Sequence, residues 1–193
     1  SGLDKETAYD LYYVAQDKAG NFSVMVQKVV INTLDESGPK IRQYFSKYDG
    51  TDETKNPMPA TDIILEFTEN VRYSGENGGE GFLELYKAYD EAQGATNKAD
   101  ALARLVTSVR GSITLWREDS STGQNVEVTH RYSVLPGQPE HTENANWVID
   151  YEQVKVEMRD GKMLVTFPES GLNLDSGATY YFTIHDLTDT STA

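Results

Sequence analysis

The chain has 193 residues, of which 38% are hydrophobic, so it can bury the core of one full domain and part of another. It carries 31 acidic and 17 basic residues, and the resulting net charge of -14 repels phosphate and disfavours nucleic acid as a partner. The absence of cysteine excludes disulfides and thiolate metal sites.

The first 34 residues predict a β-hairpin. Apolar side chains alternate with other residues between Tyr9 and Ala15, which is the period of a strand with one buried face. Residues 17–21 include Gly and Asn and predict a turn, and residues 22–32 predict the returning strand. Because a lone hairpin is not stable, we expect it to belong to a larger sheet. A polar segment from Leu34 to Pro39 then predicts a linker.

The next elements are two strands and a helical segment. Strands are predicted at 40–45 and 61–68, and the second has its apolar residues at every other position. Residues 82–110 break this pattern, because their apolar residues recur at i, i+3, i+4 and i+7 and form helical faces. One or two helices are therefore predicted there, although the aromatic run 82–86 also fits a short strand.

Strands resume after the helical segment. They are predicted at 113–116, at 126–134 and at 180–184, and a hairpin between 154 and 167 turns at Asp160-Gly161. From the alternation along these strands we predict seven core residues, namely Ile63, Leu65, Phe67, Val156, Met158, Val165 and Phe167.

Two stretches at opposite ends of the chain are versions of one another. Leu3-Asp4 is followed after four residues by Tyr9 and a strand-like alternation, and Leu174-Asp175 is followed in the same way by Tyr180. A repeat of this kind indicates two related domains in tandem.

The repeated segment resembles the tyrosine corner of immunoglobulin-like and fibronectin type III domains. The run Tyr9 to Asn21 is also similar to the ending of bacterial surface repeats, and residues 39–189 resemble the Ig-like domains of S-layer-type and other bacterial surface proteins. The matching pieces are Gly38-Pro39-Lys40-Ile41, residues 63–71, residues 161–168 and residues 174–180.

The resemblance implies a mainly β protein. Residues 35–193 would form an Ig-like antiparallel β-sandwich with a helical insertion at about 82–110, and residues 1–34 would be the terminal hairpin of a preceding Ig-like domain. The corner residues would be Leu3, Tyr9, Leu174 and Tyr180.

The same resemblance implies a non-catalytic structural or adhesion module of a multidomain bacterial cell-surface or secreted protein, located outside the cell. Its expected partners are neighbouring Ig-like domains of the same protein and cell-wall or host glycans or surface proteins. The second copy is expected to stop before the strand that follows the turn of the first copy. Residues 22–32 are therefore expected to fill the gap by strand addition, in the same molecule or by exchange between chains.

No enzyme activity is expected from the sequence. There is no Cys and no Gly-x-Ser-x-Gly elbow, and the three histidines are far apart. With 31 acidic residues, pairs of carboxylates arise by chance and single out no catalytic site. No cofactor is therefore predicted, apart from a cation discussed next.

One loop suggests calcium. Asp49, Asp52 and Glu53 bring three carboxylates together around Gly50, and hard cations prefer such oxygen-rich loops. The spacing does not follow the EF-hand pattern, and ordinary turn chemistry explains the same residues.

Carbohydrate binding is the alternative function. Sugars stack on exposed aromatic faces, and the candidate side chains are Trp116, Trp147, Tyr12 and Tyr181. Trp116 alternates with Ile113 and Leu115, which points it away from their buried face. The competing interpretation is that these aromatic residues cover the helical insertion.

Overall fold

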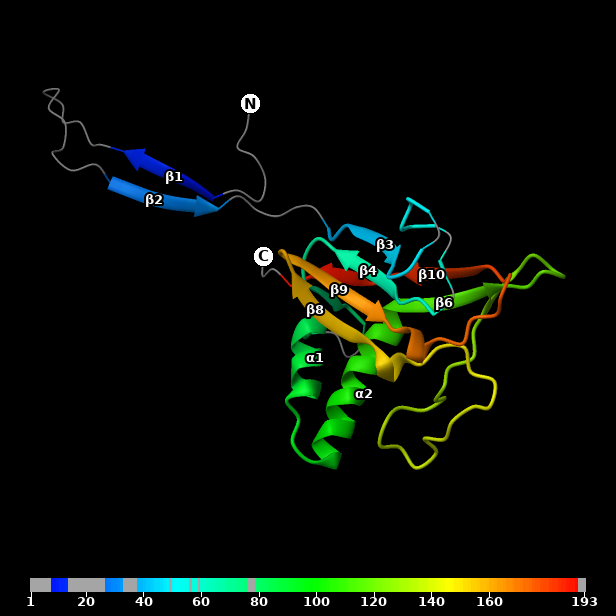
Figure 1. Ribbon diagram of the computed structural model, residues 1–193. Helices are drawn as coiled ribbons and strands as arrows, with labels where there is room; N and C mark the ends of the chain where they lie inside the picture. The colour runs from blue at the N-terminus through cyan, green and yellow to red at the C-terminus, as the bar shows by residue number, and fades with distance from the viewer. Residues whose placement is uncertain are drawn as a thin grey trace, which may run out of the picture. The chain divides into compact units, whose positions relative to one another are not determined.

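The protein is mainly β, with antiparallel sheets and two helices (Figure 1). The computed structural model describes residues 38–48, 50–55, 57–58, 60–75 and 79–190, and the backbone of two strands before them. The chain divides into two compact units, Ser1–Gly38 with Ser191–Ala193, and Pro39–Thr190. Whether residues 1–34 belong to a preceding domain stays a prediction.

The first unit contains an antiparallel hairpin. Strands β1 (Ala8–Tyr13) and β2 (Gln27–Asn32) pair in a register that places Tyr9 opposite Ile31 and Leu11 opposite Val29. The side chains of this hairpin, the predicted turn at 17–21 and the predicted corner residue Leu3 lie outside the described residues.

The second unit is built on two main sheets and a short strand pair. The four-stranded sheet has the order β3 (Ile41–Phe45), β4 (Ile63–Phe67), β9 (Lys162–Phe167), β8 (Lys155–Arg159). The three-stranded sheet has the order β10 (Tyr180–Ile184), β6 (Ile113–Glu118), β7 (Asn125–Glu127). The short pair is β5 (Val71–Tyr73) with β11 (Leu187–Asp189), and single turns of 3-10 helix lie at Tyr151–Gln153 and Glu169–Gly171.

The core is formed by the inner faces of the two main sheets together with one face of each helix. On β4 every second side chain is buried, and Leu65 and Phe67 are each only 1% exposed. From the other sheet, Phe182 of β10 stacks on Phe167 of β9 with the ring centroids 5.1 Å apart. The alternation in the sequence is therefore explained by burial of one face of each strand.

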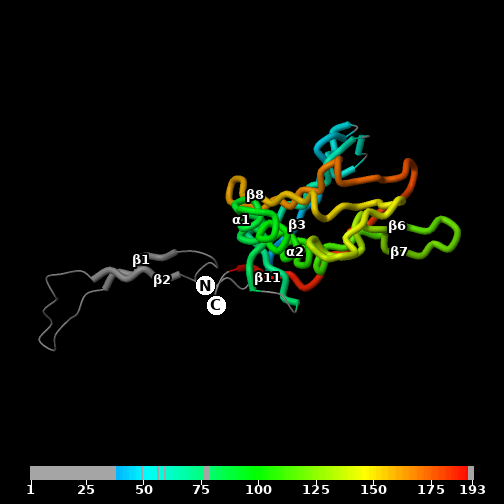
Figure 2. The backbone as a smooth tube through the Cα atoms, turned by 90° about the horizontal axis from the view of Figure 1, so that it is seen from below, coloured from blue at the N-terminus to red at the C-terminus, as the bar shows by residue number. Residues whose placement is uncertain are grey.

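Two helices connect β5 to β6. Helix α1 (Phe82–Asp90) and helix α2 (Ala95–Ser112) pack against each other, and they contact β8 and β6, respectively (Figures 1 and 2). Both lie in the segment where the sequence predicted helix, and the alternative of a strand at 82–86 is wrong. Gly94 separates the helices at a φ of 81°, a conformation that glycine adopts without steric cost.

Six of the seven predicted core residues are buried, and the prediction for Met158 is wrong. Its side chain is 42% exposed, although it alternates correctly with Val156, which is 2% exposed. Met158 lies on β8, which is an edge strand of its sheet. Alternation predicts on which face of the sheet a side chain lies. Whether another element covers that end of the strand depends on the tertiary structure.

The prediction of a strand at 126–134 is also wrong, except for its first two residues. Strand β7 ends at Glu127, and Val126 is 54% exposed. After it the chain is irregular, and single bridges, including His130 to Ile149, replace a continuous ladder. The β6–β7 hairpin projects from the rest of the unit (Figure 2).

In the described part of the chain, neither helix has the length and apolar character needed to cross a bilayer.

The core packing predicts a large difference between two residues of one hairpin. Phe167→Ala should lower the free energy of unfolding by about 3–5 kcal/mol, because it opens a cavity between the sheets. Met158→Ala, the matched control, should change it by less than about 0.5 kcal/mol, because surface substitutions have small effects. Urea denaturation measures both, and equal losses would contradict this account of the core.

Candidate functional site

Trp116 and Tyr181 lie side by side on the outer face of the three-stranded sheet. They are directly opposite each other in the antiparallel pairing of β6 and β10. The neighbouring residues Leu115 and Phe182 face the core instead, so the two aromatic side chains point outward. Of the four residues predicted to bind carbohydrate, the structure brings these two together.

Polar groups surround this aromatic pair. The indole Nε1 of Trp116 donates a hydrogen bond to Thr183 Oγ1 at 2.8 Å, which directs the ring toward β10 rather than toward a helix. The Tyr181 hydroxyl donates to Glu118 Oε2 at 3.3 Å, and the negative charge of Glu118 raises the pKa of Tyr181. Glu127 on β7 pairs with Trp116 in the register of the sheet. The outer face therefore offers aromatic rings beside hydrogen-bonding oxygens, and Tyr181 is 43% exposed.

The other two predicted residues are elsewhere. Trp147 lies in the irregular segment, where its Nε1 donates to Glu143 Oε1 at 3.0 Å and the guanidinium of Arg131 lies 5.0 Å from its ring centroid. One face of this indole is therefore covered by a cation. Tyr12 belongs to β1, whose side chains lie outside the described residues.

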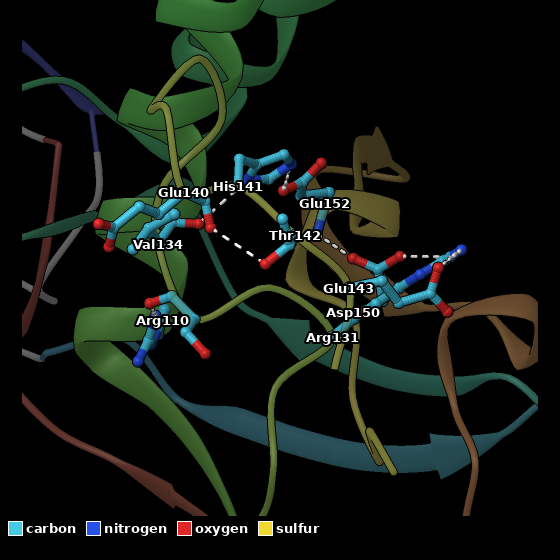
Figure 3. Close-up of polar contacts among 10 residues, drawn as sticks. Arg110, Arg131, Val134, Glu140, His141, Thr142, Glu143, Asp150 and Glu152 are labelled. Atoms are coloured by element: carbon cyan, nitrogen blue, oxygen red, sulfur yellow. Dashed lines mark hydrogen bonds and ion pairs between the residues drawn. The ribbon is translucent and has the colours of Figure 1, made fainter. Parts of the chain in front are cut away.

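A charged cluster surrounds Arg131 (Figure 3), and no pattern in the sequence predicted it. Its two terminal nitrogens donate to Asp150 Oδ2 at 3.1 Å and to Glu143 Oε2 at 3.3 Å. The Asp150 side chain is 1% exposed, and its second oxygen accepts the backbone N–H of Glu152 at 3.0 Å. Arg131 is the cation that compensates this buried carboxylate.

A second ion pair braces the same segment. His141 Nε2 lies 3.1 Å from Glu152 Oε1 (Figure 3). The His141 ring also stacks on Tyr132 with a centroid distance of 4.1 Å. Burial raises the pKa of Glu152, while the positive charge of His141 lowers it. Together with Arg131, these contacts hold the irregular chain between β7 and β8 in place.

The chemistry open to this cluster is limited by its geometry. Asp150 and Glu143 are paired with Arg131, and Glu152 is paired with His141. The adjoining cavity, lined by residues including Val106 and His130, has a volume of about 10 Å³, which is about the size of one water molecule. Burial lowers the pKa of His130. The three carboxylates of the cluster are therefore engaged in ion pairs within the protein.

The loop predicted to bind calcium has its described carboxylates engaged within the protein. Asp52 accepts hydrogen bonds from the hydroxyl and the backbone N–H of Thr54, and these lower its pKa to about 2. Asp52 also pairs with Lys55 at 3.1 Å, and Glu53 pairs with Arg42. Asp49 lies outside the described residues, among which no group of three metal-ligating side chains occurs. Calcium binding stays a prediction.

The predicted corner residue Tyr180 begins strand β10. Its hydroxyl accepts the backbone N–H of Asp175 at 3.0 Å, which closes the turn between residues 175 and 180. Leu174 is 38% exposed and lines an open groove beside this turn. The groove also contains Phe45, Leu115 and Phe182, and its volume is about 910 Å³.

The comparisons with known proteins assign no family. The chain matches no protein-family model, no curated protein and no solved structure. Inferences about function therefore rest on the contacts described above and on the resemblance seen in the sequence.

The charged cluster predicts a site-specific loss of stability. Arg131→Met should lower the free energy of unfolding by about 3 kcal/mol, because it leaves Asp150 buried without a compensating charge. Arg159→Met, the matched control, removes an exposed pair with Glu157 and should cost less than about 0.5 kcal/mol. Thermal denaturation at pH 7 measures both. Similar losses in the two variants would show that Arg131 does not compensate a buried charge.

Proposed function

We propose that the protein is a non-catalytic, Ig-like structural or adhesion module of a multidomain bacterial cell-surface or secreted protein. The observation that carries this proposal is the order of the strands in the two main sheets, β3-β4-β9-β8 and β10-β6-β7.

Strand order supports the Ig-like class. In Ig-like domains one sheet has the order A-B-E-D, and strands C and F pair in the other. If β3 is strand A, the chain order makes β4, β6, β8, β9 and β10 strands B, C, D, E and F, with β7 as C′. The four-stranded sheet then has the order A-B-E-D, and β6 pairs with β10 as C pairs with F. The two helices would be an insertion between strands B and C.

The corner contact supports the same class. In Ig-like domains a tyrosine near the start of strand F bonds through its hydroxyl to the backbone a few residues upstream. Tyr180 is the first residue of β10, and its hydroxyl bonds to the backbone of Asp175. The matching segment at Tyr9 would be the corner of a preceding domain, with β1 and β2 as its last two strands. Neighbouring Ig-like domains would then be the first partners of the module, outside the cell.

A structural module under tension should unfold as one unit. When the full chain is stretched between two reference domains, residues Pro39–Thr190 should release about 500 Å in one step, at roughly 3.5 Å per residue. Tyr180→Phe should lower the unfolding force, because it removes one hydrogen bond of about 1 kcal/mol.

Tyr181→Phe is the matched control for this measurement by single-molecule force spectroscopy. It removes the hydroxyl from the adjacent tyrosine, which makes a solvent-exposed hydrogen bond of 3.3 Å to Glu118, so the force should not change. Unfolding in several short steps at low force would count against a structural role.

Carbohydrate binding is a second candidate, and the pairing of Trp116 with Tyr181 favours it. Two neighbouring aromatic rings on a sheet surface can stack on the C–H faces of a sugar, while the carboxylate of Glu118 accepts hydrogen bonds from its hydroxyls. An adhesion module that binds cell-wall or host glycans would use this face. It would need no bound cofactor and no catalytic group.

Glycan binding can be tested with the two tryptophans of the chain. On an array of cell-wall and host glycans, Trp116→Ala should weaken binding about fivefold, because one aromatic stacking contact contributes about 1 kcal/mol. Trp147→Phe, the matched control, should retain binding, because Trp147 packs on Arg131 away from the outer face. No binding by the wild-type chain, or a loss only with Trp147→Phe, would contradict the assignment of this face.

A further inference from the structure

One edge of β10 has no partner strand among the described residues. This strand pairs with β6 along its other edge, in a five-residue register from Tyr180 to Ile184. An unpaired edge presents a row of backbone N–H and C=O groups that can accept another strand.

The inner face of β3 is also uncovered. Ile41 and Gln43 pair with Phe67 and Leu65 of β4 and therefore share their face of the sheet. The two β4 residues are each 1% exposed, whereas Ile41 is 44% exposed and Gln43 is also exposed. Ile41 and Gln43 therefore lie on the interior side of the sheet and are nevertheless exposed, whereas Phe45 at the end of β3 packs against the core.

The open groove lies between these two strands. Its lining includes Gln43 and Phe45 of β3, Leu115 of β6, and Tyr180 and Phe182 of β10. In Figure 1, β3 and β10 are both on the upper side of this unit, and the two helices are on the lower side. An extended strand on the free edge of β10 would therefore place one row of its side chains in a groove lined by core residues.

We propose that the free edge of β10 and the open groove form an acceptor site for an added β-strand, and that its occupant is β2 of a second copy of this chain. The repeat in the sequence indicates which strand would occupy this site. The segment of β1 matches the segment of β10, and the strand that pairs with β1 is β2. A strand that fits β1 should fit its counterpart.

The repeat also specifies the register. Aligning Tyr9 with Tyr180 places Leu11 on Phe182 and transfers the pairing of the hairpin to β10. Ile31 then lies opposite Tyr180, and Val29 lies opposite Phe182. Because Tyr180 and Phe182 line the groove, the apolar side chains of Ile31 and Val29 would enter it.

The residues on the outward side of the added strand also match the residues that they would face on β10. In the same register Lys28 lies opposite Thr183, and Val30 lies opposite Tyr181. Thr183 and Tyr181 are both exposed on the outer face of the sheet. A lysine at this position remains in contact with water.

Charge favours this occupant over an acidic strand. Residues 22–32 contain one lysine and no Asp or Glu, in a chain that carries 31 acidic residues. The groove contains Glu169, which would repel a strand that carries carboxylates. A two-stranded hairpin is marginally stable in water, so β2 loses little when it leaves β1 to join a larger sheet. This strand addition rests on the sequence repeat and on the open groove. It does not require that the protein belong to the Ig-like class.

The absence of native cysteine allows a direct test in the full chain. The Lys28→Cys and Thr183→Cys variants are mixed and oxidised, and a disulfide-linked dimer of one copy of each is measured by intact mass spectrometry. The pair Tyr181→Cys with Val30→Cys, two residues along the same register, should form the same kind of dimer. Both acceptor positions are exposed, so the substitutions leave the core unchanged.

The matched control shifts the register by one residue. Val29→Cys mixed with Thr183→Cys should give about tenfold less mixed dimer, because a shift by one position moves the side chain to the other face of the sheet. Equal yields from the matched and shifted pairs would overturn the proposal. So would a Lys28→Cys, Thr183→Cys double variant that forms its disulfide only within a monomer, since the strand would then come from the same molecule.

Discussion

The contact between Phe167 and Phe182 is the interaction on which the rest of this structure depends. It joins the two main sheets, and Tyr151 packs edge-on against Phe167 with a centroid distance of 5.9 Å. The Tyr151 hydroxyl donates to Ile113 O at 2.8 Å, so this buried aromatic group is also satisfied in its hydrogen bonding. Because Phe182 faces inward, Tyr181 must face outward. The core contact therefore determines both the groove and the outer aromatic face.

The irregular segment between β7 and β8 is stabilised in a different way. It lacks a continuous ladder, and its backbone is held by a buried carboxylate, one guanidinium and a histidine pair. Burial of Asp150 is costly unless its charge is compensated, which makes Arg131 the residue on which this segment depends. The carboxylates of Asp150 and Glu143 therefore take part in the contacts that hold this segment.

The two candidate interaction surfaces require different partners. The outer face of β6 and β10 offers aromatic rings and oxygen acceptors, which suits a sugar. The edge of β10 offers backbone hydrogen-bonding groups above an apolar groove, which suits an extended strand. Since both surfaces lie on the same strand, an added strand would extend the outer face and place Lys28 and Val30 beside it. Binding on one surface could therefore influence the other.

The sequence alone determined the type of most elements and the buried face of several strands. Alternation identified Ile63, Leu65 and Phe67 as core residues, and helical spacing identified the segment that contains α1 and α2, because both signals are local. It could not determine that Met158 is exposed or that Trp116 lies beside Tyr181, since these depend on which elements meet in space. The charged cluster left no local signal either, because Arg131 meets Asp150 across an irregular chain with no period. Only the tertiary structure decided these contacts, because packing between distant segments determines which faces are covered and which charges are paired.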